Sequence, residues 1–267
     1  MSKIFWYIEK LLIFGFVCIR LFFYCLVHPK KFFELFFILF SNINAFYQSS
    51  IGRLLNFNES KIYDKIQETQ VFAKTNVFNV ELEVARPMET QILSSLVSYF
   101  KPRTVFEIGT YTGFTAMHFT LNSPESSIVY TLDLPENFQA SQDQRLSYDD
   151  KLVIKLSTEN IHRRIFKNTP QEQKIVELFG DSKTFDFSPY YGKIDFIYVD
   201  GNHSHDYVQS DTENAMKMLS DHGVIVWHDY DYIIHRDVFK YLNKLSKEYK
   251  IYSIPHTRFA IYGKNLE

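Results

Sequence analysis

The chain has 267 residues, a formal net charge of −2 and no cluster of basic residues. That length allows one α/β domain plus an appendage, and the charge excludes the basic surface of a nucleic-acid-binding protein. The only two cysteines, Cys18 and Cys25, would lie about 10 Å apart along a helix, too far for a disulfide. We therefore expect no nucleic-acid partner, no cysteine-based metal site and a reducing, cytoplasmic setting.

Residues 1–47 form an apolar, phenylalanine-rich segment. Within it, residues 11–27 carry one charge, Arg20, and a second apolar stretch covers residues 32–40. A helix over residues 11–27 would span about 25 Å, slightly less than a bilayer core of about 30 Å. Three interpretations stay open: a spanning helix or signal anchor, an interfacial hairpin, and a buried helical subdomain or dimer face. We predict membrane association through residues 4–40 and leave the oligomeric state open.

A polar stretch, residues 48–85, follows as a linker or helical region, and we place the main domain at residues 86–267. Pro87 and Glu89 are start signals for a helix whose apolar positions run to Phe100. From residue 104 onward, apolar β-rich stretches alternate with helical patterns. This alternation predicts an α/β fold with a parallel sheet and right-handed crossovers.

The elements of this domain follow from hydrophobic periodicity. The expected strands are residues 104–108, 127–132, 174–179, 194–199 and 224–227, and the expected helices are residues 113–122, 205–220 and 234–248. Two short β-like stretches, residues 251–254 and 259–262, predict an antiparallel pair at one edge. Residues 135–173 are polar and are expected to be an irregular insertion or substrate lid, since they are long for a connection.

The stretch from Val105 to Gly113, sequence VFEIGTYTG, predicts a strand, a tight glycine turn and the start of a helix. Such a turn at a strand's carboxyl end binds nucleotides in α/β folds. The dinucleotide fingerprint G-x-G-x-x-G is absent, because Tyr111 stands where its second glycine would be. Glu107 would also repel a pyrophosphate. A ligand with a nucleoside and no phosphates, such as S-adenosylmethionine, suits the turn formed by Gly109, Thr110 and Gly113.

Acidic residues follow every inner strand of the predicted sheet. They are Glu107, Asp133, Asp181 with the neighbouring Ser182, Asp200, and Asp229. Because ligands of open α/β sheets bind outside the carboxyl ends of the strands, we expect this row to line a cofactor site that includes Asp200. Asp133 is placed for the ribose hydroxyls, Asp181 and Ser182 for the adenine edge, and Glu107 for the methionine part. The alternative for each is a turn acid that accepts a backbone amide hydrogen.

Several motifs in order give the chain a resemblance to a known family. They are Gly180-Asp181-Ser182, the stretch DFSPYYGK at residues 186–193, Val199-Asp200-Gly201-Asn202-His203, and Trp227-His228-Asp229-Tyr230. Over residues 86–263 the chain resembles the small-molecule group of class I S-adenosylmethionine-dependent methyltransferases. The resemblance implies a Rossmann-like, doubly wound seven-stranded sheet of order 3-2-1-4-5-7-6 with the last strand antiparallel. It also implies cofactor binding at Glu107, Gly109, Gly113, Asp133 and Asp181.

Candidate catalytic residues follow the fourth and fifth strands. His203, His228 and Asp229 would face one crevice, and histidine suits proton removal near neutral pH. The alternatives are a helix-capping role for His203 and a packed core position for His228, while His205 is expected at a helix start on the surface. Asp200, His228 and Asp229 could also hold a divalent cation, as some catechol-type relatives do at corresponding strand ends. The chain departs from their Asp-Asn pair, so metal dependence is left open.

These observations predict a methyltransferase that uses S-adenosylmethionine and acts on a small-molecule or glycan acceptor, with a hydroxyl as the expected acceptor group. Two alternatives are kept. One is an NAD(P)-dependent oxidoreductase, which the missing dinucleotide fingerprint disfavours. The other is a non-catalytic, membrane-tethered binding module with the same fold.

Overall fold

The computed structural model describes residues 87–136, 138, 148–231, 235–254 and 257–266. The apolar segment 1–47, with the membrane association predicted for residues 4–40, and the linker 48–85 lie outside the described residues. Among the helices that are described, none combines the length and the apolar character needed to cross a bilayer.

The described part is built on one seven-stranded sheet of order β3-β2-β1-β4-β5-β7-β6. Its strands are β1 (Thr104–Ile108), β2 (Ile128–Asp133), β3 (Ile175–Phe179), β4 (Ile194–Val199), β5 (Leu219–Trp227), β6 (Tyr252–Ser253) and β7 (Ala260–Gly263). Strands β1 to β5 pair in parallel, and β7 runs antiparallel to both β5 and β6. The predicted strand order and antiparallel last strand are confirmed.

One strand prediction differs in detail. Strand β5 begins at Leu219 rather than at residue 224, because Leu219 pairs with Ile194 across an irregular step that precedes the regular pairing of Val224 with Phe196. The two closing strands form the predicted antiparallel pair at one edge, with β7 between β5 and β6 as the predicted order places it. Its backbone pairing with β5, Trp227 opposite Ala260, fixes the segment just before β7 beside the end of β5.

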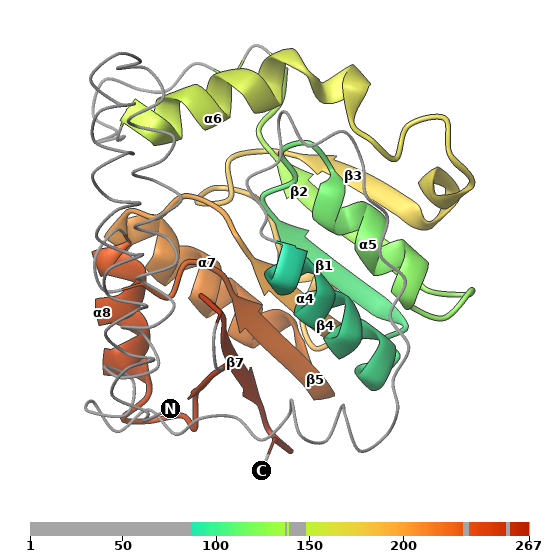
Figure 1. The fold of residues 1–267 in the computed structure, drawn as a ribbon. Coiled ribbons are helices and arrows are strands. Elements are labelled where there is room, and N and C mark those ends of the chain that lie inside the picture. Colours follow the sequence, from blue (N-terminus) through green and yellow to red (C-terminus); the bar gives the residue numbers. More distant parts are fainter. Residues whose placement is uncertain (1–86, 137, 139–147, 232–234, 255–256, 267) are drawn as a thin grey trace, which may run out of the picture. The chain divides into compact units, whose positions relative to one another are not determined.

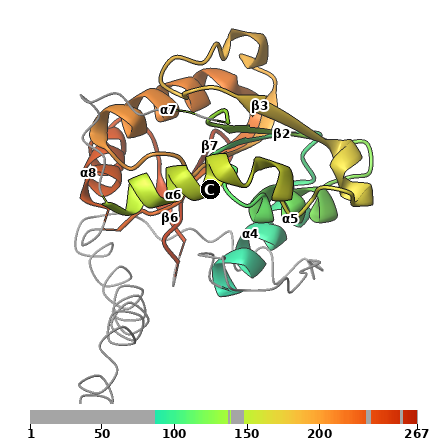
Figure 2. The ribbon, with the colours of Figure 1, turned by 90° about the horizontal axis from the view of Figure 1, so that it is seen from above.

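Helices cover both faces of the sheet (Figures 1 and 2). One buried cluster joins the sheet to α4 (Pro87–Phe100) and α5 (Phe114–Asn122), and the other joins it to α7 (His205–Met218) and α8 (Arg236–Leu245). Helix α4 buries Leu96 and Val97 completely. This is the apolar face that the helical pattern predicted. Helices α7 and α8 are shorter than predicted, and α7 ends where β5 begins.

The segment between β2 and β3 is more regular than expected. It contains the helix α6 (Tyr148–Glu159) and the 3₁₀ turns η2 (Ile161–Arg163) and η3 (Pro170–Lys174), so the prediction of an irregular insertion is wrong. Ser157 of α6 donates a hydrogen bond to Asp133 at the end of β2, with 2.5 Å between the oxygens. Helix α6 therefore passes over the carboxyl end of β2, and Figure 2 shows it crossing in front of the strands.

Candidate active site

The turn after β1 has both of its glycines in the left-handed region, with φ of 101° at Gly109 and 78° at Gly113. A Cβ on Gly109 would lie 2.1 Å from the backbone oxygen of Asp200, and one on Gly113 would lie 2.4 Å from the Phe166 ring. The chain's own packing therefore requires these glycines. The contacts with Asp200 and Phe166 could not be predicted, because a sequence pattern does not show which later segments pack on a turn.

Glu107 ends β1 inside the protein, with no exposed surface. Its Oε2 accepts a hydrogen bond from Thr131 Oγ1 at 2.5 Å, while Oε1 has no hydrogen-bond partner. Thr110 extends this chain, since its Oγ1 lies 2.6 Å from Thr131 Oγ1. Burial raises the pKa of Glu107 well above 4.5, although the Thr131 hydroxyl opposes the shift. A buried carboxyl with one unpartnered oxygen is costly unless a ligand completes it.

Asp133 ends β2, next to the glycine turn, as expected. Its Oδ2 accepts the backbone hydrogen of Tyr111 at 2.9 Å and lies 2.9 Å from Nη2 of Arg164, in addition to the Ser157 contact. The Arg164 side chain has no exposed surface and also pairs with Glu177 on β3 at 2.7 Å. The predicted ribose-binding carboxylate is therefore held in place by the segment after α6.

Asp181 and Ser182 follow β3. Asp181 accepts hydrogen bonds from the Lys183 backbone at 3.0 Å and from the Tyr207 hydroxyl at 2.8 Å. Ser182 is buried and faces the carboxyl of Asp211 on α7. The two residues occupy the predicted strand end, and their hydrogen bonds within the chain match the alternative of a turn acid.

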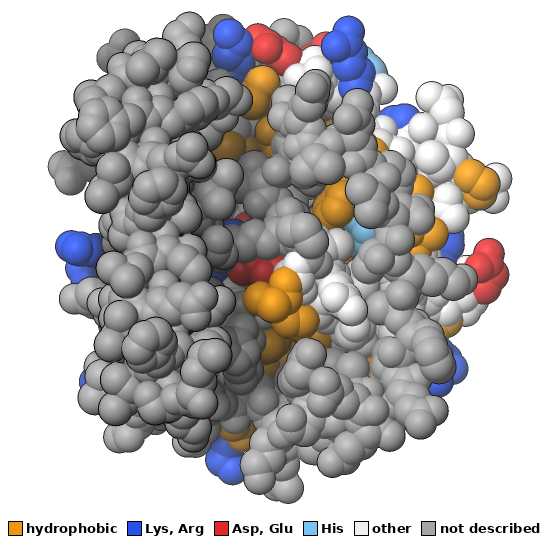
Figure 3. All heavy atoms as spheres, in the orientation of Figure 1, with side chains coloured by type: hydrophobic (Ala, Val, Ile, Leu, Met, Phe, Trp, Pro, Cys, Tyr) orange, Lys and Arg blue, Asp and Glu red, His pale blue; other side chains and the backbone are white. Residues whose placement is uncertain are grey.

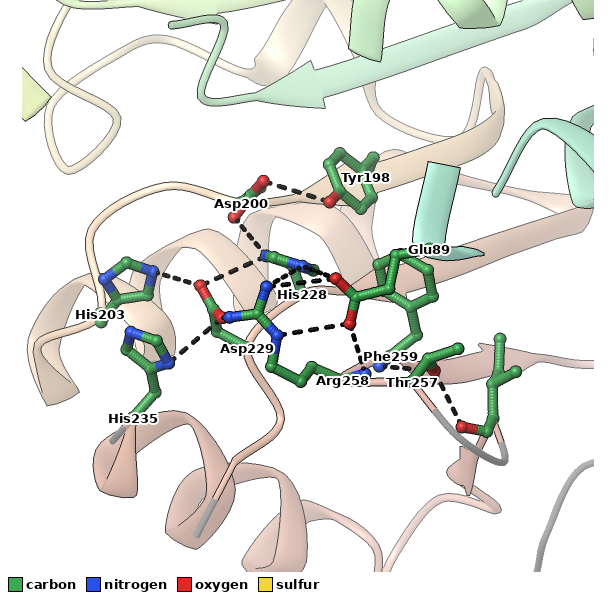
Figure 4. A network of polar contacts seen from close by, with 11 residues as sticks. Glu89, Tyr198, Asp200, His203, His228, Asp229, His235, Thr257, Arg258 and Phe259 are labelled. Atoms are coloured by element: carbon green, nitrogen blue, oxygen red, sulfur yellow. Dashed lines mark hydrogen bonds and ion pairs between the residues drawn. The ribbon is translucent and has the colours of Figure 1, made fainter. Parts of the chain in front are cut away.

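Four predicted residues come together after β4 and β5: Asp200, His203, His228 and Asp229 (Figure 4). Asp229 Oδ2 lies 2.8 Å from His203 Nε2 and 3.2 Å from His228 Nδ1. His228 Nδ1 is also 3.1 Å from Asp200 Oδ1, and the other Asp200 oxygen accepts the Tyr198 hydroxyl at 3.1 Å. The backbone of Asp229 has a φ of 54°, a left-handed conformation that a non-glycine residue keeps only where its surroundings fix it.

Three residues of this network were not predicted from the sequence. Glu89, in the first turn of α4, and Arg258, just before β7, form a buried pair with 3.1 Å between Glu89 Oε2 and Arg258 Nη2. His235, just before α8, places Nδ1 3.2 Å from Asp229 Oδ1. Glu89 had been interpreted only as a helix-start signal. No local pattern marks the other two, because each reaches the site from a distant part of the chain.

His228 lies between Asp200 and Asp229, and its surroundings differ from those of His203. Both ring nitrogens of His228 are engaged: Nδ1 by Asp200 and Asp229, and Nε2 by Glu89 at 3.4 Å and Arg258 at 3.3 Å. Its side chain is 11% exposed, against 29% for His203. His228 therefore serves as a structural member of the network, whereas His203 presents more of its ring to the outside. His205, as expected, begins α7 with an exposed side chain.

The pKa shifts of the network follow its charges. Burial opposes the charged form of His228, but Asp200 and Asp229 outweigh burial and raise its pKa well above 6.5. Burial would raise the pKa of Asp229, but the positive charges of His228 and Arg258 hold it well below 3.8. For Glu89 as well, burial is outweighed, by His228 and Arg258, and the pKa falls to about 2. The cluster thus holds ionised carboxylates that are paired with cations inside the protein.

A small cavity of about 20 Å³ lies beside this network. It is lined by residues that include Asp200, His203, Asp211, Trp227 and His228. That volume holds about one water molecule, so it is too small for an acceptor. Figure 3 shows acidic side chains at the centre of one face of the molecule with apolar side chains beside them.

Comparisons with known proteins find one family model and several solved structures that are similar to this chain. Residues 106–230 match a family model described as a methyltransferase domain. The structure of the Podospora anserina methyltransferase PaMTH1, bound to SAH, is similar at a TM-score of 0.52 and 14% identity, over 77% of this chain and 96% of that one. A putative caffeoyl-CoA O-methyltransferase from Staphylococcus aureus (TM-score 0.48, 16% identity, 83% and 100% covered) and an O-methyltransferase from Bacillus cereus in complex with SAH (0.48, 13%, 84% and 100%) are also found. At these identities the likeness concerns the fold.

Proposed function

Residues 106–230 match a methyltransferase domain, and on that premise we propose that the protein is a class I, S-adenosylmethionine-dependent methyltransferase that methylates a hydroxyl group of a small-molecule or glycan acceptor. The observation that carries the proposal is the pairing of two features at neighbouring strand ends. Glu107 is buried with an unpartnered Oε1, and the His203–Asp229 pair lies after β4 and β5. The first suits a cationic ligand, and the second suits proton removal.

The residues around β1 and β2 fit the cofactor. Oε1 of Glu107 would accept a hydrogen bond from the ammonium group of the methionine part, which would let the carboxyl ionise. Asp133 Oδ1 accepts one backbone hydrogen, from Leu134, and has acceptor capacity left for a ribose hydroxyl. When bound, S-adenosylmethionine supplies an electrophilic methyl group on a sulfonium. The chain's own residues then have to position the acceptor, exclude water and remove a proton.

His203 is the base that the geometry favours. Its Nε2 lies 2.8 Å from Asp229 Oδ2 as an ion pair without hydrogen-bond geometry, so the charge of the carboxylate stabilises the imidazolium that forms when His203 takes the acceptor's hydroxyl proton. This is the role that a buried carboxylate plays beside histidine in other enzymes. His228 is excluded from that task because both of its nitrogens are already engaged. Cofactor roles for Gly109, Thr110, Gly113, Asp181, Ser182 and Asp200 stay predictions.

Calorimetry of S-adenosylmethionine binding in two buffers of different ionisation enthalpy tests the Glu107 part of the proposal. At mildly acidic pH, where the raised pKa keeps Glu107 protonated, binding should release a proton, so the measured heat should depend on the buffer. In Glu107→Gln the affinity should fall by about tenfold or more and the buffer dependence should vanish. Asp221→Asn, which removes one exposed carboxylate at the other end of β5, is the matched control. It should retain the affinity for S-adenosylmethionine and the buffer dependence of the heat.

Transfer of label from S-adenosylmethionine to a panel of catechols, phenols and sugars tests the acceptor class. Methylation of hydroxyl groups is expected. A protein that binds no S-adenosylmethionine would refute the proposal. Binding without transfer to any acceptor would favour the non-catalytic alternative, and equal thermal stabilisation by NAD would revive the oxidoreductase alternative.

A further inference from the structure

A buried guanidinium lies among the carboxylates at the ends of β4 and β5 (Figure 4). Arg258 is 7% exposed. Its Nη1 donates to Asp229 Oδ1 at 2.5 Å, and its Nη2 and Nε donate to the two oxygens of Glu89 at 3.1 Å and 3.3 Å. Its backbone N–H also donates to Glu89 at 2.9 Å. Two buried carboxylates therefore fix this positive charge from two sides.

The backbone holds Arg258 in this position independently of its side chain. The Arg258 carbonyl accepts the Tyr230 N–H at 3.0 Å, which ties the segment to the residue after Asp229. On the other side, the Thr257 hydroxyl donates to the Ile254 carbonyl at 2.8 Å and accepts the Phe259 N–H at 3.0 Å. These backbone contacts therefore fix the position of Arg258 between β5 and β7.

One of these two carboxylates, Asp229, also belongs to a group that a divalent cation could use. Asp200, His228 and Asp229 offer ligand atoms within 4.8 Å of one another, but each of these atoms already faces a partner within the protein. Asp229 Oδ1 accepts from Arg258, and Oδ2 faces two histidine nitrogens. His228 Nδ1 lies 3.1 Å and 3.2 Å from two carboxylate oxygens, so it carries hydrogen and has no electron pair for a metal. This donor set does not fit a divalent cation.

A second group of possible metal ligands is equally occupied by contacts within the protein. His203, Asp229 and His235 also lie within 4.8 Å of one another. Their common member is Asp229, and the two ring nitrogens that would bind a metal face its oxygens at 2.8 Å and 3.2 Å. A cation placed here would lie beside the guanidinium that Asp229 already binds, and like charges at that range repel.

We propose that Arg258 supplies the fixed positive charge that a bound divalent cation would otherwise supply at this end of the sheet, and that the protein transfers methyl groups without a metal. The inference rests on the proposed function. Arg258 acts as a positioning residue: it holds Asp229, and the charge of Asp229 in turn stabilises the His203 imidazolium. The hydroxyl proton of the acceptor goes to His203, with no hydroxyl bound to a metal.

Binding of Mn²⁺ to the full-length protein, followed by electron paramagnetic resonance, tests the proposal without requiring turnover. The wild type should show no saturable Mn²⁺ site, with or without S-adenosylmethionine. Arg258→Ala, which frees Asp229 and Glu89, should gain one saturable site. Arg258→Lys is the matched variant, since it keeps the charge, and should gain none.

A saturable site in the wild type that Asp229→Asn abolishes would overturn the proposal, and this result does not depend on whether any Arg258 variant folds. A folded Arg258→Ala that gains no site would also overturn it, because Arg258 would then not be what excludes the metal. Label transfer that stops on chelation and returns with Mn²⁺ would do the same. The calorimetric binding of S-adenosylmethionine reports separately on the proposed function.

Discussion

Replacement of Asp211 by asparagine should stabilise the protein at alkaline pH. Asp211 lies on α7 with 1% of its surface exposed, and neither carboxyl oxygen completes a hydrogen bond of normal geometry. The Ser182 hydroxyl faces the carboxyl and favours its ionised form, but burial outweighs that contact and raises the pKa of Asp211 from 3.8 to about 7. The native state therefore keeps a proton that the unfolded state loses at lower pH.

The direction and size of the effect follow from linkage. Between pH 3.8 and about 7 the native state binds one more proton than the unfolded state, so the free energy of unfolding falls as pH rises through that window and is flat above it. A shift of about three pKa units corresponds to about 4 kcal/mol as an upper value. Asparagine has the same shape and no charge. Asp211→Asn should therefore match the wild type below the window and be more stable above it, by at most about 4 kcal/mol.

Urea unfolding, followed by circular dichroism at a series of pH values, measures this directly. The difference between Asp211→Asn and the wild type should grow with pH up to about 7 and then stay constant, with unchanged m-values. Asp221→Asn, with an 89% exposed side chain, is the control and should show no such growth. A difference that is independent of pH, or that shrinks as pH rises, would refute the reasoning.

Two further substitutions, one of them with a matched control, test contacts inside the protein. Gly109→Ala should destabilise the protein by about 3 kcal/mol or more, since its Cβ would lie 2.1 Å from the Asp200 backbone oxygen. Gly192→Ala is the control: Gly192 has a φ of 69° and nothing within 4 Å of an added Cβ, so only backbone strain of about 1 kcal/mol is expected. Equal losses for the two variants in urea unfolding would contradict the clash. Thr212→Val removes the acceptor of the buried Trp227 Nε1 hydrogen, now 3.0 Å from Thr212 Oγ1, and should cost about 1–3 kcal/mol; unchanged thermal unfolding would show that the bond contributes nothing.

The strand order and the row of strand-end acids could be predicted because both leave local signals. Strand β1 ends in an acid and a glycine turn, and β4 and β5 end in Asp200 and in the pair His228-Asp229. Parallel strands then bring these ends to one edge of the sheet. Helix α6 was missed because charged residues interrupt its apolar positions, and its contacts with Asp133 come from the fold.

The partners of the strand-end residues could not be predicted. Glu89 and Arg258 are 169 positions apart, and their contact depends on how α4 and β7 lie relative to the sheet. Neither residue stands out in the sequence, since an acid in a first helical turn and a single arginine in a hairpin are both ordinary features. Their pairing nevertheless decides the charge around Asp229, whose Oδ2 lies 2.8 Å from His203 Nε2.

The role of His203 is tested most directly by the rate of label transfer from S-adenosylmethionine to a hydroxyl acceptor in His203→Gln, at saturating cofactor. His222→Gln, an exposed histidine on the other half of β5, is the matched control. Loss of a general base should lower kcat by about 10²- to 10⁴-fold, with cofactor affinity unchanged. Transfer by His203→Gln at the rate of His222→Gln would contradict His203 as the base.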